Sequence, residues 1–204
     1  MHALILSTLT ALSIYPLNPA AEDTIPAMNL HVAVGYAAPN GVMDGGPEAS
    51  THLELSLGHP FIVRASADVR QGDVSSRPWP HGKMMSTTFS TDALYYRGTN
   101  RLTAYAGVGA LYALSAFDAD DRVLDSLYKL DGITDVRYEC NVGFRITVGL
   151  RFHRLYCFEM AFSRMNSRYV FDRRISPTSF ALTREKAAVN DARLSVGYII
   201  PLRK

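Results

Sequence analysis

Residues 136–152 read VRYECNVGFRITVGLRF and carry the clearest structural pattern in the chain. Every second residue is apolar, from Val136 through Phe144 to Phe152, and the residues between them are charged, polar or glycine. A period of two is typical of a β-strand with two different faces, because successive side chains point to opposite sides. Strands of soluble proteins average about five or six residues. A tilted strand needs about nine to eleven residues to cross a bilayer, so this run predicts a membrane-spanning strand.

The same alternation occurs in seven further segments, which are residues 30–36, 52–57, 61–70, 85–95, 102–114, 156–163 and 192–202. Long connections at 38–50, 71–84, 117–134 and 172–189 alternate with short turns at 58–60, 97–100 and around His153. Outer-membrane barrels have short turns on the periplasmic side and long loops outside. The sequence therefore predicts an all-β fold, a closed up-and-down antiparallel transmembrane barrel of about eight strands spanning residues 28–202.

Residues 1–21 are expected to form a cleavable signal peptide. The apolar run from Ala3 to Tyr15 has the length of a signal core and is too short to span a membrane as a helix. Pro16 ends the run, and Ala20 or Ala21 is the expected last residue removed. The alternative for this segment is a short buried helix.

The two faces of the strands predict a lipid-facing and an inward set. The apolar parity faces lipid, and the opposite parity carries charges that nearly cancel. An eight-stranded barrel is just wide enough for side chains to fill it, so a plugged lumen with a polar network is expected. That predicted network consists of Glu54, Arg64, Asp68, Arg70, Asp92, Glu139, Arg145, Glu159 and Arg193. The alternative is a soluble periplasmic ligand-binding barrel of lipocalin type, with the apolar parity inside.

Aromatic residues near strand ends predict two girdles at the membrane interfaces. The girdle near the short turns would contain Phe61, Tyr95, Tyr96, Phe152 and Tyr156. The outer girdle would contain Tyr36, Tyr112, Phe117, Tyr138, Tyr169 and Phe171.

The end of the last strand resembles the β-signal that the barrel-assembly machinery of Gram-negative bacteria recognises. Ser195, Gly197, Ile200 and Leu202 match its polar, glycine and hydrophobic positions. The sequence departs from it at Pro201 and by Arg203 and Lys204, and no aromatic residue ends the chain. Because proline is not tolerated within a strand ladder, the strand is expected to stop near Ile200.

With Gly143–Phe152 and the eight long strands, the chain resembles the OmpA/OmpX-type porin family, or outer-membrane β-barrel domain proteins. The resemblance implies an outer-membrane location in a Gram-negative bacterium, contact with the assembly machinery and membrane lipid, and a structural or interaction role at the cell surface. We expect a monomer.

A catalytic role is the weaker hypothesis, and no enzyme activity is expected. Lipid A-modifying barrel enzymes of the deacylase type use a histidine and a serine oriented by an acid, and His52, Ser56 and Glu54 provide those groups on one strand. Similar residues are expected in any polar lumen.

No cofactor or metal site is expected, because the sequence has no phosphate-binding loop and no zinc-type cysteine spacing. Asp118–Asp121 are interpreted as a solvated acidic loop.

Cys140 and Cys157 are expected to be free thiols, since they fall at different heights and on opposite faces. The formal net charge of +2 is too small to indicate a nucleic-acid partner. Arg164, Asn166 and Arg168 lie near the outer rim and are candidates for contacts with lipopolysaccharide phosphates. The alternative is that these side chains project above the lipid into water.

Overall fold

The structure, a computed structural model, describes residues 28–38, 42–75, 81–99, 101–139, 142–176 and 179–203. The expected signal peptide and Cys140 lie outside these residues. The elements of the described chain are β1 (Met28–Ala37), β2 (Gly46–Gly58), β3 (Phe61–Val74), β4 (Gly82–Gly98), β5 (Leu102–Ala119), α2 (Asp121–Asp131), β6 (Ile133–Glu139), β7 (Val142–Phe152), β8 (Tyr156–Ser176) and β9 (Ser179–Arg203).

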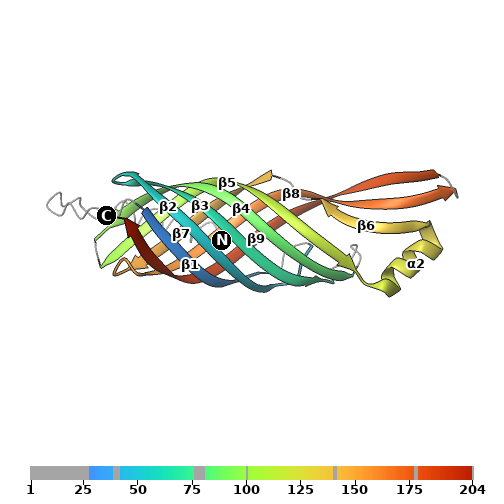
Figure 1. Cartoon of the computed structure of the whole chain (residues 1–204), viewed down its shortest axis with the longest axis horizontal. Helices are drawn as coiled ribbons and strands as arrows, with labels where there is room; N and C mark the ends of the chain where they lie inside the picture. Colours follow the sequence, from blue (N-terminus) through green and yellow to red (C-terminus); the bar gives the residue numbers. More distant parts are fainter. Residues whose placement is uncertain are drawn as a thin grey trace, which may run out of the picture.

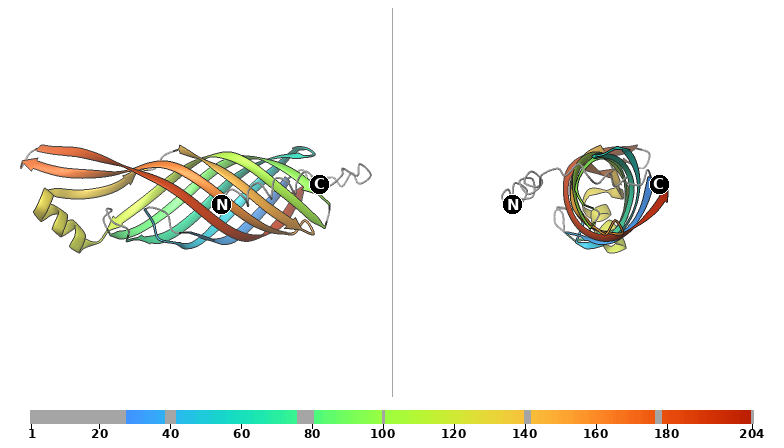
Figure 2. Two further views of the ribbon diagram at one scale, coloured as in Figure 1. Left: turned by 180° about the vertical axis from the view of Figure 1, so that it is seen from behind. Right: turned by 90° about the vertical axis from the view of Figure 1, so that its left-hand side faces the viewer.

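Eight of these strands form a closed antiparallel ring. The pairing runs from β1 through β2, β3, β4, β5, β7 and β8 to β9, and β9 pairs again with β1. The view along the axis shows the ring, and the side view shows the strands tilted around it (Figures 1 and 2). The fold predicted from the sequence is confirmed. Met28 pairs with Arg203, so the start of the first strand and the end of the last strand lie on the same side of the barrel.

Tight turns close the three hairpins on that side. His153 and Arg154 have φ values of 51° and 61° and lie at the centre of a β-turn that the Leu155 N–H closes on the Phe152 carbonyl oxygen at 3.1 Å. A positive φ at both central residues is what a type I′ turn requires. Gly58, with φ of 105°, occupies a backbone region that other residues rarely adopt. These are the positions where the sequence predicts short turns.

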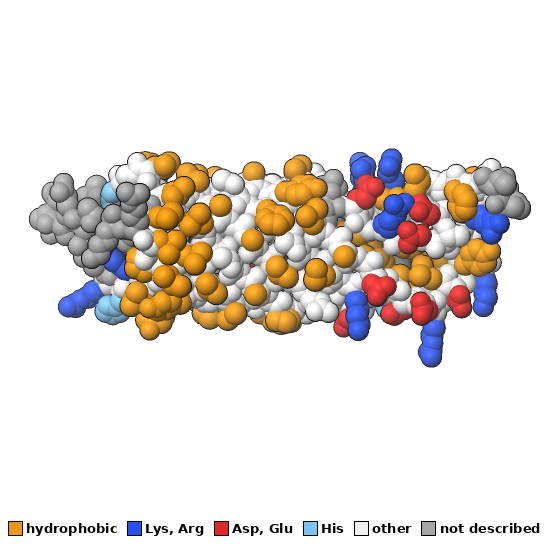
Figure 3. All heavy atoms as spheres, viewed as in Figure 1, with side chains coloured by type: hydrophobic (Ala, Val, Ile, Leu, Met, Phe, Trp, Pro, Cys, Tyr) orange, Lys and Arg blue, Asp and Glu red, His pale blue; other side chains and the backbone are white. Residues whose placement is uncertain are grey.

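The outer wall of the ring is apolar. Val34 is 61% exposed, Val108 63% and Phe144 53%, although all three lie within strands. On the face that Figure 3 shows, hydrophobic side chains spread along the barrel wall, and most of the charged side chains gather over one end. A soluble protein rarely exposes so extensive an apolar surface. A closed sheet also leaves no strand edge whose backbone N–H and C=O groups would lack partners in hydrocarbon.

The charged end is a projection built from α2, β6 and the outer parts of β8 and β9 (Figure 1). The prediction that residues 117–134 and 172–189 are loops is wrong, because both segments contain regular secondary structure. β8 continues to Ser176 and pairs with β9 from Ser179 onward, and α2 occupies 121–131. Leu124 and Leu127 of α2 pack on a buried cluster, which provides the tertiary contact that a short helix needs. No helix among the described residues is long and apolar enough to cross a membrane.

The single strand predicted over 136–152 is also wrong, because it is two strands. β7 pairs with β5 in the ring, whereas β6 pairs with β8 outside it. Val136 and Tyr138 of β6 are buried, whereas Val142 and Phe144 of β7 are exposed. The apolar face of β6 turns inward because, beyond the bilayer, the outside is water. The apolar cluster it joins, the mouth cluster, consists of Val42, Met43, Val74, Met84, Val136, Tyr138, Tyr169, Phe171 and Val189.

The last strand passes through Pro201 and continues to Arg203, so the expected stop near Ile200 is wrong. The register between β9 and β1 shifts there, with Asn29 opposite Pro201 and Met28 opposite Arg203. On the other side β8 pairs with β9 only as far as Tyr198. Pro201 therefore lies where it has only one paired neighbour, and its missing N–H is tolerated.

Candidate functional site

The inside of the ring holds an electrically balanced set of buried charges. Five carboxylates and five guanidinium groups are buried there: Glu48, Glu54, Asp68, Asp92, Glu159, Arg64, Arg70, Arg145, Arg151 and Arg193. Of the nine residues predicted for the lumen, the structure places all except Glu139 in this set. Glu139 lies on β6 with its side chain 39% exposed and accepts a hydrogen bond from Arg168. The displacement of β6 from the ring explains this correction.

Arg64 lies at the centre of the interior with its side chain fully buried. Its Nε donates to Asp92 Oδ2 at 3.1 Å, and its Nη1 donates to Glu159. Arg145, also buried, reaches across to Asp68 at 2.8 Å and to Asp92. Asp92, on β4, therefore bridges two arginines from β3 and β7. Buried charges are stable only when they are paired and hydrogen-bonded in this way.

A second arginine layer lies toward the short turns. Arg151 donates to Glu54, and its guanidinium lies 4.3 Å from the centre of the Tyr96 ring. The Tyr96 hydroxyl donates to Glu54 at 2.9 Å, and His31 Nε2 lies 3.1 Å from Glu54. Glu54 thus has three partners. Tyr96, which the sequence predicts in the girdle near the short turns, is buried here. The other members of that girdle are exposed as predicted, and these are Phe61, Tyr95, Phe152 and Tyr156.

Inward glycines let these large side chains pack closely. A Cβ on Gly109 would lie 2.0 Å from Asp92 Oδ1, and a Cβ on Gly149 would lie 2.3 Å from the Tyr105 ring. Tyr105 needs that position because its hydroxyl donates to Glu159 at 2.9 Å. The glycines on the inward parity therefore provide space for the network.

The interior does not assemble a catalytic triad from His52, Ser56 and Glu54. His52 Nδ1 lies 2.8 Å from Ser66 Oγ, and His52 Nε2 lies 3.0 Å from Ser50 Oγ. Glu54 instead binds Arg151 and His31. His52 is 2% exposed and contacts serines other than the predicted one.

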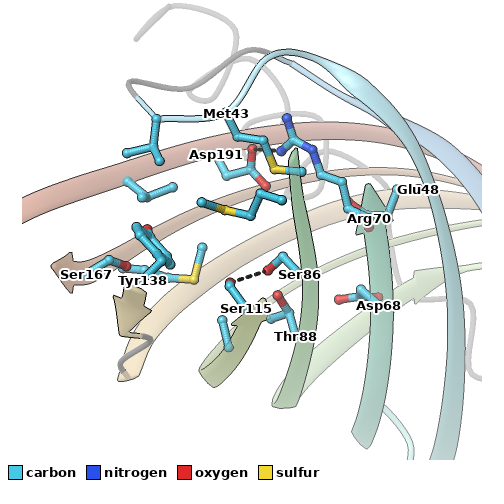
Figure 4. Close-up of a pocket in the computed structure, with 15 residues that line it drawn as sticks. Met43, Glu48, Asp68, Arg70, Ser86, Thr88, Ser115, Tyr138, Ser167 and Asp191 are labelled. Atoms are coloured by element: carbon cyan, nitrogen blue, oxygen red, sulfur yellow. Dashed lines mark hydrogen bonds and ion pairs between the residues drawn. The ribbon is translucent and has the colours of Figure 1, made fainter. Parts of the chain in front are cut away.

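Above the network, at the outer mouth, lies a cavity of about 40 Å³, room for a few water molecules. Figure 4 shows Arg70, Asp191 and Ser115 among the polar side chains that line this cavity, together with Met43 and Tyr138. Arg70 Nη1 donates to Asp191 Oδ1 at 2.8 Å, which links β3 to β9 across the mouth. The cavity thus joins the polar interior to the mouth cluster.

The wall beside this cavity is interrupted between β5 and β6. The β5–β7 ladder ends where Tyr112 pairs with Val142, and β6 pairs only with β8 among the described strands. Outside the gap lies a recess whose lining includes Met85 and Leu114. Ser115 and Tyr138 line both this recess and the mouth cavity, so they stand between the two.

The predicted acidic loop at Asp118–Asp121 is wrong, because Asp118 lies at the end of β5 and the other two aspartates lie at the start of α2. Asp120 is the residue preceding the helix, and Asp121 lies in its first turn, where the helix dipole favours a negative charge. Across the described part of the chain, no group of three or more acidic, histidine or cysteine side chains is placed to hold a metal ion.

The residues predicted as an assembly signal lie on β9 next to β1. Ser195 is buried and pairs with Gly35, whereas Ile200 and Leu202 are 39% and 48% exposed. Gly197 fits closely between strands, since a Cβ there would lie 2.7 Å from the Ala33 Cβ. Cys157 is buried in the interior as a free thiol.

Sequence reasoning missed several members of the interior. Arg151 and Tyr105 lie on the inward parity, so extending the list along each strand would have found them. Glu48 falls in the predicted connection at 38–50, yet it continues the parity of His52 and Glu54. Tyr96 gave no separate signal, because an aromatic residue near a turn suits either a girdle or the interior.

A scan against protein-family models found no match, and a search of curated proteins found none either. Three solved outer-membrane proteins share the fold. OprG from Pseudomonas aeruginosa is 15% identical with a TM-score of 0.58, covering 86% of this chain and 97% of its own. Neisserial surface protein A is 9% identical with a TM-score of 0.54, at 86% and 97% coverage. AlkL, solved in lipid bilayers, is 12% identical with a TM-score of 0.54, at 93% and 98% coverage. The predicted similarity to small outer-membrane barrels is confirmed for the fold.

Proposed function

We propose that this chain, a small outer-membrane β-barrel by its fold and its apolar wall, has a plugged lumen and a non-enzymatic role at the cell surface. The part that acts would be the projection of α2, β6 and the outer hairpin of β8 and β9. The buried arginine–carboxylate network carries the proposal. Arg64 of β3 binds its ladder neighbour Asp92 of β4 and reaches Glu159 of β8 on the opposite side of the ring. Arg145 of β7 reaches Asp68 of β3, so paired charges cross the interior, which supports a closed path.

Conductance in planar bilayers tests the plugged lumen. The purified chain is inserted from detergent, and insertion is checked by the heat-modifiable migration typical of folded barrels. We expect no steady ion conductance, because an ion would have to displace paired charges from the centre. A large porin inserted in the same way is the positive control. A stable ohmic channel from the folded chain would refute the plug.

A second candidate function is the passage of small apolar molecules between the mouth cavity and the outer leaflet. It is favoured by Ser115 and Tyr138, which line both the mouth cavity and the lateral recess. The mouth cluster above the cavity would provide an apolar surface, and the polar network below would stop the molecule from continuing along the axis. The molecule would then leave sideways into lipid.

Filling the recess tests this second function. Ala116→Trp places a bulky ring in the recess, and Ala93→Trp places the same ring on the lipid-facing wall of β4 as the matched control. Uptake of a fluorescent apolar dye into cells is compared with and without each variant. Slower uptake with Ala116→Trp alone supports lateral passage. Uptake that does not depend on the chain at all rules it out.

A further inference from the structure

The outward face of β8 changes character at Arg164. Below this position Phe158 is 41% exposed on the apolar wall, and Met160 and Phe162 continue the outward parity up to Arg164. Above it the outward residues are Arg164, Asn166 and Arg168. Arg164 pairs across the ladder with Phe144 of β7, which is 53% exposed on the same wall. Arg164 therefore lies at the upper boundary of the apolar belt.

β9 adds two cations to the same face. Lys186 lies opposite Arg168, and Arg184 lies opposite Val170. Directly opposed residues of an antiparallel pair share a face with Cβ atoms about 4.5–5.5 Å apart. We call Arg164, Arg168, Lys186 and Arg184 the basic column. At about 3.3 Å per residue it extends roughly 20 Å along the strands, upward from the edge of the belt.

Most of this positive charge is not neutralised within the chain. Arg168 donates to Glu139, and the nearby acids Asp135 and Asp172 bind Arg137. Among the described residues, Arg164, Arg184 and Lys186 form no ion pair. The opposite rim differs, because Lys83 on β4 is flanked in register by Asp73 and Asp118. At Lys83 the neighbouring acids therefore outnumber the cation, whereas on the β8–β9 side the cations outnumber their paired acids.

We propose that the basic column binds the phosphate groups of lipopolysaccharide in the outer leaflet. The proposal rests on the membrane placement in the proposed function. Hydrocarbon covers the wall below Arg164, so the groups next to the column are those that join the acyl chains to the headgroup. Guanidinium groups bind phosphate oxygens through two parallel hydrogen bonds, which suits Arg164 and Arg184. Charge complementarity therefore selects a phosphorylated lipid.

A triple variant, Arg164→Ser with Arg184→Ser and Lys186→Ser, tests this site. Lys83→Ser removes one rim cation away from the column and is the control. The protein in detergent micelles is titrated with bisphosphorylated lipid A and with dephosphorylated lipid A carrying the same acyl chains. We expect the triple variant to bind the bisphosphorylated lipid about tenfold more weakly, because three exposed charge contacts are each worth a few tenths of a kcal/mol or more. Lys83→Ser should bind as the unaltered chain does.

The remaining outcomes also decide the matter. If the unaltered chain binds both lipids equally, the acyl chains alone are recognised and the site is refuted. If inorganic phosphate competes at the same concentration as the lipid, the column is a general anion site. Heat-modifiable migration confirms that each variant is folded. Failure of the chain to insert into bilayers would refute the proposed function, whereas normal insertion without phosphate preference would refute only this inference.

Discussion

At the scale of single residues, the interior depends on pairing, not on the number of charges. Arg64 is fully buried and joins Asp92 to Glu159, so neither carboxylate is left alone. Removing one partner of a buried pair leaves an uncompensated charge, which costs more than the pair contributes. Exposed pairs such as Arg137 with Asp172 contribute little, because water screens them.

Arg64→Met is therefore expected to reduce the free energy of unfolding by about 3–5 kcal/mol. Arg137→Met, which removes an arginine that is 58% exposed, should cost about 1 kcal/mol or less. Urea unfolding in lipid vesicles, followed by far-ultraviolet circular dichroism, measures both. Equal losses for the two variants would contradict the idea that the network is sealed from water.

Gly109→Ala is expected to destabilise the barrel by about 1–3 kcal/mol through overpacking. The added methyl group would lie 2.0 Å from Asp92 Oδ1 and 2.5 Å from the Thr91 carbonyl oxygen. Gly72→Ala is the control, because its nearest neighbour is the flexible end of Met43 at 3.0 Å. The same urea unfolding applies. A Gly109→Ala barrel as stable as the control would show that the interior has room to spare.

At the scale of elements, the apolar parity changes sides where a strand leaves the membrane. In β8, Phe158 and Phe162 lie on the outward parity, whereas Tyr169 and Phe171 above them are buried in the mouth cluster. The pKa of the Tyr169 hydroxyl is raised by burial and by the neighbouring Tyr138. Hydrocarbon favours apolar side chains outside, and water favours them inside, so the reversal marks the boundary.

Because β6 is not part of the ring, the barrel should survive its removal. Replacing residues 121–139 with a flexible glycine–serine linker is expected to leave heat-modifiable migration intact. Amide hydrogen exchange within 168–172 should rise at the alternate residues whose N–H groups bond to β6, whereas the N–H groups that bond to β9 should stay protected. Exchange at 64–68 in the β3 wall should not change. If the variant fails to form a heat-modifiable barrel, then β6 and α2 are needed for closure.

At the scale of the whole molecule, polarity is divided along the axis. The tight turns and the paired ends Met28 and Arg203 lie at one end, and the charged projection lies at the other (Figures 1 and 3). External regions of outer-membrane barrels are the longer ones. The projection is therefore expected outside the cell, and the tight turns in the periplasm.

Cysteine labelling on intact cells tests this orientation. In a chain whose two native cysteines are alanine, Ser179→Cys near the hairpin tip should react with a membrane-impermeant maleimide. His59→Cys in a tight turn, an equally exposed position, should react only after the outer membrane is opened. If only His59→Cys reacts on intact cells, the tight turns face outward and the expected orientation is wrong.

The local sequence pattern is enough to specify the ring of eight strands. Strict alternation gives each strand one apolar and one polar face, and the tight turns are encoded locally, so the strand count and most inward charges could be predicted. Only the tertiary structure decided the break between Glu139 and Val142, because the alternation continues unchanged across it. Which face of β6 is inside depends on whether its surroundings are hydrocarbon or water, and the partner strand decides that. For this reason Glu139 lies outside the interior, and the position of β6 on the mouth cluster could not be predicted from residues 136–152.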